Sequence, residues 1–221
     1  MTKRKKPQDC IQINYHFKAL NREQTRALEC LRTNTICFLT GPPGTAKTFL
    51  ATAWATEQLL SRDLGFKVSR PAVQQGQESG FLPGTAAQKT APFLYPIYEA
   101  VDQLCGVEFS PLVKQKIEIV PLSMIRGRNI RYATFVIDEA QNLLWNEVLA
   151  ICTRLGEGGQ IIFCGDISQN DHKDGTSRLE EAAHRLNGVE VGEHKIGWYQ
   201  FTMQAVVRHP LIPAIIEAMA G

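Results

Sequence analysis

The chain has 221 residues, of which 44% are hydrophobic and 21% are charged, a composition typical of a globular protein with one well-packed α/β core. It contains no run of about 18 apolar residues, and no apolar segment follows the charged N-terminus, which argues against a membrane span and a secretory signal. We therefore expect a cytoplasmic protein that does not contact a membrane.

The positive charge is concentrated near the N-terminus. The segment Lys3 to Lys6 carries four of the 24 basic residues, so 20 basic residues face 22 acidic ones in the rest of the chain. We divide the chain into a basic tail, 1–20, and one domain, 21–221. Such a tail can hold nucleic acid by counterion release, and a solvated terminus is the alternative. The six cysteines and five histidines show no metal-ligand spacing, so we predict reduced thiols and no structural zinc.

The first predicted element is a helix that begins at a capping-box pattern, Asn21 followed by Gln24. A short apolar strand, residues 35–40, then runs directly into a Gly-Pro-Pro-Gly turn. Helical spacing returns after the turn, with Leu50 and Leu59 on one side. A strand, a tight loop and a helix in this order are typical of a parallel α/β sheet.

Strands and helices alternate in the rest of the sequence. Further strands are predicted at 66–69, 117–120, 132–137, 160–164 and 196–201. Helices are predicted from Ile97 to a stop at Gly106, from Leu144 to Leu155, at 176–186, and around 212–219. A Gly- and Gln-rich stretch at 70–84 is typical of a functional loop. This alternation predicts a mainly parallel sheet covered by helices on both faces.

The motif that carries the chemistry is the eight-residue loop after the first strand, which reads Gly41, Pro42, Pro43, Gly44, Thr45, Ala46, Lys47 and Thr48. Small residues let backbone N–H groups and the next helix N-terminus approach a phosphate. Lys47 is predicted to reach the β- and γ-phosphates, and the Thr48 hydroxyl to bind Mg²⁺. Ala46 replaces the usual second glycine, which is tolerable if its φ is negative. A simple turn is the alternative.

Polar side chains follow two later strands. Asp138 and Glu139 follow 132–137, and Gln169 follows 160–164, which predicts them at the carboxyl edge of the sheet, where ligands bind. Asp138 suits the Mg²⁺ shell, and Glu139 suits a base that orients the attacking water. Gln169 is a candidate sensor of the γ-phosphate. The alternatives are a helix-dipole role for the acidic pair and a turn role for Gln169. No guanine-reading NKxD segment is present, so ATP is the expected nucleotide.

These motifs, together with the segments 69–84, 124–129, 136–142, 165–171 and 206–212, resemble the PhoH-like ATPase family over nearly all of the chain beyond residue 20. The resemblance implies a single RecA-like P-loop domain, similar to the first motor domain of superfamily 1 helicases, with an additional central strand and a catalytic glutamate. It also implies that Gln24 reads adenine, that Arg70 lies in the family's loop block and that Arg208 is an arginine finger.

The arginines indicate which partners the protein is expected to bind. Because only one motor domain is present, Arg208 must act either within its own chain or on the γ-phosphate of a neighbouring subunit. We expect the latter, in a ring-like homo-oligomer, a hexamer by resemblance. A surface salt bridge is the alternative. Arg126, Arg128 and Arg131 form a basic cluster that, with Arg70 and the Lys3–Lys6 tail, is a candidate site for RNA or single-stranded DNA phosphates. An ion-paired surface cluster is equally compatible with the pattern.

The sequence therefore predicts Mg²⁺-dependent ATP hydrolysis, with coupling to RNA or single-stranded DNA binding or unwinding as a further expectation. The alternative is a nucleotide-gated assembly or binding module with little turnover, which the near-neutral body and the single motor domain favour. A nuclease is the least supported function, because the sequence shows no carboxylate cluster for a two-metal site beyond Asp138 and Glu139.

Overall fold

The computed structural model describes residues 17–71, 94–167, 169 and 178–207, together with the isolated positions 211, 214, 215 and 218. The Lys3–Lys6 tail, most of the predicted loop at 70–84, Arg208 and most of the predicted helix around 212–219 lie outside these residues.

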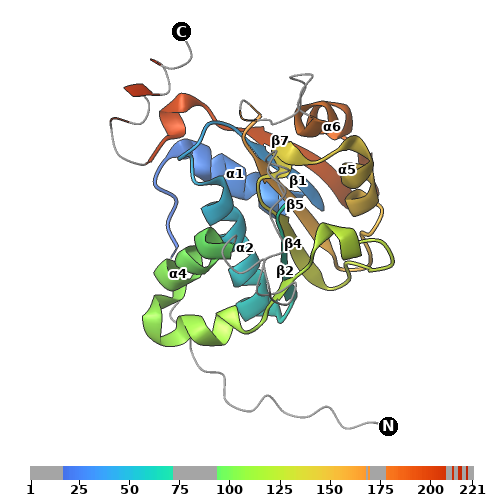
Figure 1. Cartoon of the computed structure of the whole chain (residues 1–221), viewed down its shortest axis with the longest axis horizontal. Helices are drawn as coiled ribbons and strands as arrows, with labels where there is room; N and C mark the ends of the chain where they lie inside the picture. Colours follow the sequence, from blue (N-terminus) through green and yellow to red (C-terminus); the bar gives the residue numbers. More distant parts are fainter. Residues whose placement is uncertain are drawn as a thin grey trace, which may run out of the picture.

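A seven-stranded sheet with the order β3-β2-β4-β5-β1-β7-β6 forms the centre of the molecule (Figure 1). Its neighbouring strands are parallel except for the short β6–β7 pair, which confirms the predicted α/β class with a mainly parallel sheet. Strand β5 lies between β1 and β4, as the family resemblance implied. The strands are β1 (Ile36–Thr40), β2 (Gly65–Ser69), β3 (Ile117–Ile119), β4 (Ala133–Ile137), β5 (Gln160–Gly165), β6 (Glu190–Val191) and β7 (His194–Gln200).

Helices cover both faces of the sheet (Figure 1). On one face lie α1 (Arg22–Thr33), α2 (Lys47–Arg62) and α4 (Tyr95–Lys114), and on the other lie α5 (Trp145–Cys152) and α6 (Arg178–Leu186). Three short 3-10 turns complete the described elements: η2 (Leu122–Met124), η3 (Ala140–Asn142) and η4 (Met203–Ala205). Within the described part of the chain, no helix is both long and apolar enough to span a bilayer.

The central strands are apolar throughout because each of their faces meets a layer of helices. In β1, Cys37 and Leu39 belong to the core under α1, α2 and α4, whereas Ile36 and Phe38 point to the opposite core. The Phe38 ring stacks on the Phe163 ring of β5 with a centroid separation of 4.8 Å. Each fully buried side chain of this size contributes about 1.5–3 kcal/mol. The sheet is therefore a rigid support for the loops at its carboxyl edge.

One helix prediction was wrong in its boundaries, and another was incomplete. The predicted stop at Gly106 is a break in helix α4, where the backbone is non-helical at φ 74° and ψ 156°, but a second helical stretch that was not predicted continues to Lys114. Helix α5 is shorter than the predicted stretch from Leu144 to Leu155: Leu144 is its extended N-cap, and Leu155 follows its end. The backbone after Cys152 bonds instead to Ile130, whose N–H donates to the Arg154 carbonyl at 2.8 Å. This pairing with a distant segment ends the helix.

Candidate functional site

The phosphate loop connects β1 directly to α2 and is shaped by its backbone. Gly41 and Gly44 have φ of 141° and 82°, conformations that L side chains rarely adopt. A Cβ on Gly41 would meet the Phe201 Cβ and carbonyl oxygen at 2.7 Å. Only glycine fits here, because the segment after β7 packs directly against the loop.

Ala46 does not have the negative φ at which an alanine in this position would be tolerable. Its φ is 71° and its ψ is 25°, so it lies in the left-handed region rather than at negative φ. A non-glycine residue there costs roughly 1–2 kcal/mol. Ala46 is the N-cap of α2, and its carbonyl accepts the first helical hydrogen bond from Leu50 at 2.9 Å. The loop therefore keeps its shape with some stored strain.

The segment 201–207 braces the loop and α1, a role that was not predicted from its residues. The Phe201 N–H donates to the Thr40 carbonyl at 2.8 Å, and the Val207 N–H donates to the Gly44 carbonyl at 3.1 Å. The Thr202 N–H and hydroxyl donate to the Glu23 carboxylate of α1 at 2.9 and 2.6 Å. Val207 is the last described residue before Arg208, whose own placement lies outside the described residues.

Lys47 points back into the loop that precedes it. Its Nζ donates to the carbonyl oxygens of Gly41 and Pro42 at 2.6 and 2.8 Å. Burial lowers the pKa of the Lys47 amine, and the nearby charge of Asp166 opposes this shift. The two carbonyl oxygens hold the Lys47 cation inside the loop, at the cavity that Lys47 lines, where its positive charge is available to a phosphate.

Thr48 and Asp138 meet across 90 residues of sequence. The Thr48 hydroxyl donates to Asp138 Oδ1 at 2.6 Å, and Asp138 is only 4% exposed. Burial raises the pKa of the Asp138 carboxyl, while the Thr48 hydrogen bond lowers it. A hydroxyl beside a carboxylate is the oxygen donor pair that Mg²⁺ prefers. The described residues hold no cluster of three His, Cys, Asp or Glu ligands. A Mg²⁺ held by Thr48 and Asp138 would take its other ligands from phosphates and water.

Glu139 is held by two neighbours, one on each carboxylate oxygen. Gln141 Nε2 donates to Oε2 at 2.6 Å, and Arg70 Nη2 donates to Oε1 at 3.2 Å. Its backbone adopts φ 52° and ψ 39°, a left-handed conformation that non-glycine residues seldom take. Strain of this kind occurs preferentially at functional positions. The acidic pair does not lie in the first turn of an α-helix, since α5 begins only at Trp145, so the helix-dipole alternative loses its basis.

Gln141 is a site residue that the sequence did not single out. It is only 2% exposed, and its Oε1 accepts from the Asp166 N–H at 3.1 Å while its Nε2 holds Glu139. A Cβ on Gly165 would lie 2.9 Å from the Gln141 backbone N and Oε1. Gln141 therefore links the end of β5 to Glu139. The available signal was its place two residues after Glu139 in the segment that follows β4.

Most of these groups line one cavity of about 730 Å³, within the usual range of ligand pockets, whereas Gly41, Arg70 and Gln141 are not among its lining residues. It contains the predicted residues Gln24, Pro43, Gly44, Ala46, Lys47, Thr48, Asp138, Glu139 and Gln169. Gln24 is 2% exposed, and its Oε1 accepts from the Leu20 N–H at 2.8 Å. Gln169 is exposed, and its backbone N–H donates to the Asp166 carbonyl at 3.1 Å, so its sensor and turn roles both remain predictions.

Part of the lining of the cavity was not predicted from the sequence. Phe17, Lys18 and Leu20 lie before α1, and Glu99 and Gln103 lie on α4, yet all five line the cavity. The Phe17 ring also packs against Phe49 of α2, with centroids 6.1 Å apart. Residues assigned to the tail thus contribute to the pocket.

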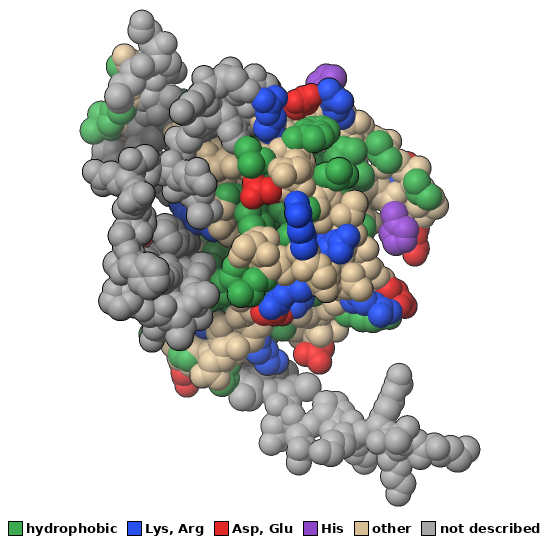
Figure 2. Space-filling view, turned by 45° about the vertical axis from the view of Figure 1, so that its right-hand side comes forward, with side chains coloured by type: hydrophobic (Ala, Val, Ile, Leu, Met, Phe, Trp, Pro, Cys, Tyr) green, Lys and Arg blue, Asp and Glu red, His purple; other side chains and the backbone are tan. Residues whose placement is uncertain are grey.

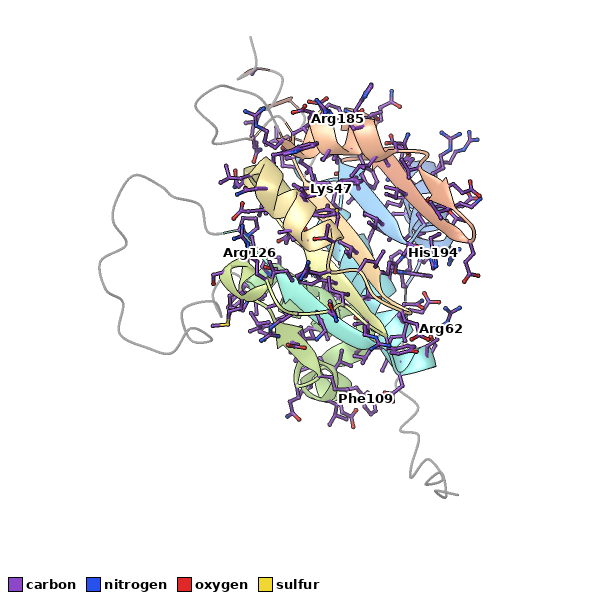
Figure 3. All side chains as sticks on the ribbon, turned by 90° about the vertical axis from the view of Figure 1, so that its right-hand side faces the viewer. Lys47, Arg62, Phe109, Arg126, Arg185 and His194 are labelled. Atoms are coloured by element: carbon purple, nitrogen blue, oxygen red, sulfur yellow. The ribbon has the colours of Figure 1, made fainter. Side chains whose placement is uncertain are left out.

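The predicted arginine cluster is largely ion-paired. Arg128 pairs with Glu118, and Arg131 pairs with Glu157 at 3.0 Å. In Figure 2, the Lys and Arg side chains of the visible face are spread among acidic and hydrophobic ones. Figure 3 draws Arg126 in the left half of the view, opposite Arg62 and His194. These pairs favour the ion-paired reading of the cluster, and its binding of nucleic acid remains a prediction.

Arg70 occupies a different place from the one expected of a nucleic-acid contact. It is the residue directly after β2, and its guanidinium lies against Asp138 and Glu139 inside the site. Its contact with RNA or single-stranded DNA also remains a prediction.

Comparisons with known proteins agree with these motifs. A family model described as PhoH-like protein matches residues 16–220. The PhoH-like protein of Synechocystis is 37% identical over 205 residues, which cover 91% of this chain and 61% of the relative. The PhoH-like protein of Bacillus subtilis is 36% identical over 88% of this chain and 61% of its own length. Protein PhoH of Escherichia coli is 33% identical over 90% of this chain and 57% of its own length.

The chain thus spans about three fifths of the length of the curated relatives it matches. Among solved structures, the Pif1 helicase from Candida albicans aligns with 84% of this chain and 41% of its own, at 16% identity and a TM-score of 0.41. A similarity this low supports no statement about function.

Proposed function

The chain belongs to the PhoH-like protein family, and we propose that it binds ATP together with Mg²⁺ and hydrolyses the γ-phosphate. The observation that carries the proposal is the 2.6 Å hydrogen bond from Thr48 to Asp138. It joins the end of the phosphate loop to the acidic edge, so that a phosphate site, a metal site and a candidate base lie in one cavity.

The loop supplies the binding part of this function. Lys47 and the N-terminal end of α2 present positive charge where the phosphates of ATP are expected. When bound, Mg²⁺ would neutralise phosphate charge beside Thr48 and Asp138. Gln24 and the wall formed by Phe17 and Leu20 enclose the end of the cavity proposed for adenine.

Glu139 is proposed to carry the chemical step. Its carboxylate orients a water and accepts a proton from it while the water oxygen forms a bond to the γ-phosphorus. The bond from that phosphorus to the bridging oxygen breaks, and ADP leaves with the oxygen. Gln141 keeps Glu139 aimed through its hydrogen bond to Oε2. Most of the catalysis in such a site comes from positioning and charge rather than from covalent steps.

Phosphate release by the wild type, Lys47→Ala and Glu139→Gln tests this function. Glu139→Gln keeps the size and hydrogen-bonding capacity of the side chain but cannot accept the proton, so turnover should fall about 10²- to 10⁴-fold while ATP binding persists. Lys47→Ala should lose binding as well. Arg185→Gln, which removes an exposed pair with Glu181 outside the cavity, should match the wild type. Equal rates in all four proteins would refute the proposal.

A nucleotide-gated module with little turnover is the alternative, and the same assay separates it. Strong ATP-dependent assembly together with negligible phosphate release from the wild type would favour the module. Hydrolysis that depends on Glu139 would favour the enzyme.

We also propose that Arg208 acts across a subunit boundary in a ring-like homo-oligomer. An arginine at the γ-phosphate can raise the rate about 10³- to 10⁵-fold. Light scattering with and without nucleotide tests the assembly, and a monomeric mass under both conditions contradicts it.

Coupling to nucleic acid is proposed through Arg126, Arg128 and the Lys3–Lys6 tail. RNA or single-stranded DNA should then stimulate ATP hydrolysis, and the stimulation should fade as salt rises because counterions compete for the phosphates. A rate that does not respond to either polymer at low salt would exclude this coupling.

A further inference from the structure

Arg70 is fixed next to the acidic pair by the register of the sheet. Strand β2 pairs with β4 so that Ser69 lies opposite Ile137, and the Asp138 N–H donates to the Ser69 carbonyl at 2.9 Å. The next residues of the two strands, Arg70 and Asp138, are therefore held side by side. The pairing is a consequence of backbone geometry and not of a chance side-chain conformation.

The Arg70 guanidinium reaches both acids. Its Nη1 lies 3.6 Å from Asp138 Oδ2, and its Nη2 lies 3.2 Å from Glu139 Oε1. The other two carboxylate oxygens are also engaged, Asp138 Oδ1 by Thr48 and Glu139 Oε2 by Gln141. A divalent cation and an attacking water must approach these same oxygens. Arg70 therefore competes with both ligands of the proposed reaction.

The two anchors of Glu139 differ in how easily they can be released. Gln141 is almost fully buried and bound at both ends of its amide, to Glu139 and to the Asp166 N–H. The Arg70 side chain is 24% exposed, and the Glu139 side chain is 36% exposed. Water screens an ion pair that is this accessible, so Arg70 holds Glu139 more weakly than Gln141 does; the Asp138 side chain that Arg70 also faces is only 6% exposed. Arg70 is thus the anchor that can leave.

Resting on the proposed function, we propose that Arg70 is an exchangeable counter-cation that Mg²⁺ displaces from the acidic pair and that the γ-phosphate of ATP then receives. In the proposed reaction, the attacking water lies between Glu139 and the γ-phosphate. A guanidinium bonded to Glu139 therefore lies on the γ-phosphate side of the site. The planar guanidinium fork suits phosphate oxygens as well as carboxylates. ADP has no γ-phosphate to receive it. Arg70 is therefore one group that distinguishes ATP from ADP.

Nucleotide binding, measured by calorimetry without any need for turnover, tests this exchange. With ADP, only the competition with Mg²⁺ operates, so Arg70→Gln should lower the Mg²⁺ concentration needed for half-maximal binding about two- to fivefold. With saturating Mg²⁺, Arg70→Gln should reduce the preference for ATP over ADP about tenfold, because a hydrogen bond to a charged group is lost. Arg70→Lys keeps the positive charge but not the planar fork, so its values in both readouts should lie between those of the wild type and those of Arg70→Gln.

Arg185→Gln is the matched control, since it also removes an arginine from a carboxylate, in this case Glu181 on α6, outside the cavity. It should leave both readouts unchanged. If Arg70→Gln behaves like Arg185→Gln in both readouts, the exchange does not occur. If the wild type binds no nucleotide, the proposed function fails and the exchange fails with it. If Arg70→Gln does not fold, Arg70→Lys is the variant that tests the proposal. Wild-type values of both binding readouts for Arg70→Lys would overturn it.

Discussion

The phosphate loop and the acidic edge meet at the 2.6 Å hydrogen bond from Thr48 to Asp138, yet they are built in different ways. The loop is eight consecutive residues, Gly41 to Thr48, whose backbone dihedrals and carbonyls make the site. The acidic edge consists of side chains from three strand ends, with Arg70 after β2, Asp138 and Glu139 after β4, and Asp166 after β5. One region is local, and the other is assembled by the fold.

This difference explains where each region is sensitive. The loop depends on which residues can adopt positive φ and on the space left beside Phe201. The acidic edge depends on hydrogen-bond partners, above all Gln141, whose two amide ends join Glu139 to Asp166. Changes in the loop should therefore act mainly on stability and binding, and changes at the edge mainly on turnover.

The largest effect is expected from Gly41→Ala. The new Cβ would stand 2.7 Å from the Phe201 backbone at a φ of 141°, so the loop or the segment after β7 must shift. Strain and overpacking together should lower the free energy of unfolding by about 3 kcal/mol. Urea denaturation measures this loss. Gly188→Ala is the control, since its φ is also positive, 83°, but nothing lies within 4 Å, and about 1–2 kcal/mol is expected. Equal losses would show that Phe201 does not constrain the loop.

An intermediate effect is expected from Gln141→Met, which keeps the volume of the side chain and removes both hydrogen bonds. Glu139 loses its buried anchor and the Asp166 N–H loses its acceptor, at a cost of about 1–3 kcal/mol. If Gln141 positions Glu139, steady-state kinetics should show kcat reduced about tenfold or more, with KM for ATP little changed. A raised KM with an unchanged kcat would place Gln141 in nucleotide binding instead.

The smallest effect is expected from Ala46→Gly, which should stabilise the protein. Glycine removes roughly 1–2 kcal/mol of left-handed strain, but it also adds conformational freedom to the unfolded chain, which costs about 0.4–1 kcal/mol. A net gain of about 0.5–1 kcal/mol should appear as a higher midpoint in urea denaturation. The same substitution at Ala55, inside α2, should have the opposite sign because its backbone is helical. A destabilised Ala46→Gly variant would contradict the strain seen at this position.

The strand endings explain how much could be predicted. Residues that follow an apolar strand stand at the carboxyl edge of a parallel sheet whatever the rest of the fold does, so Lys47, Thr48, Asp138 and Glu139 were assigned to one site from sequence, and they line one cavity. The limits of α5 were missed, because the apolar spacing continues where the backbone does not remain helical. The helical stretch that follows the predicted stop at Gly106 was also not foreseen.

By itself, the sequence determined the α/β class, the phosphate loop and the family. The class follows from strand and helix spacing, and the loop and the family are recognised from short contiguous motifs. Only the tertiary structure decided that Arg70 and Gln141 hold Glu139, that Ala46 has a positive φ, and that Phe17 and α4 wall the cavity. Those facts depend on which strands become neighbours and on the space between packed segments. Spacing along one chain does not encode either of them.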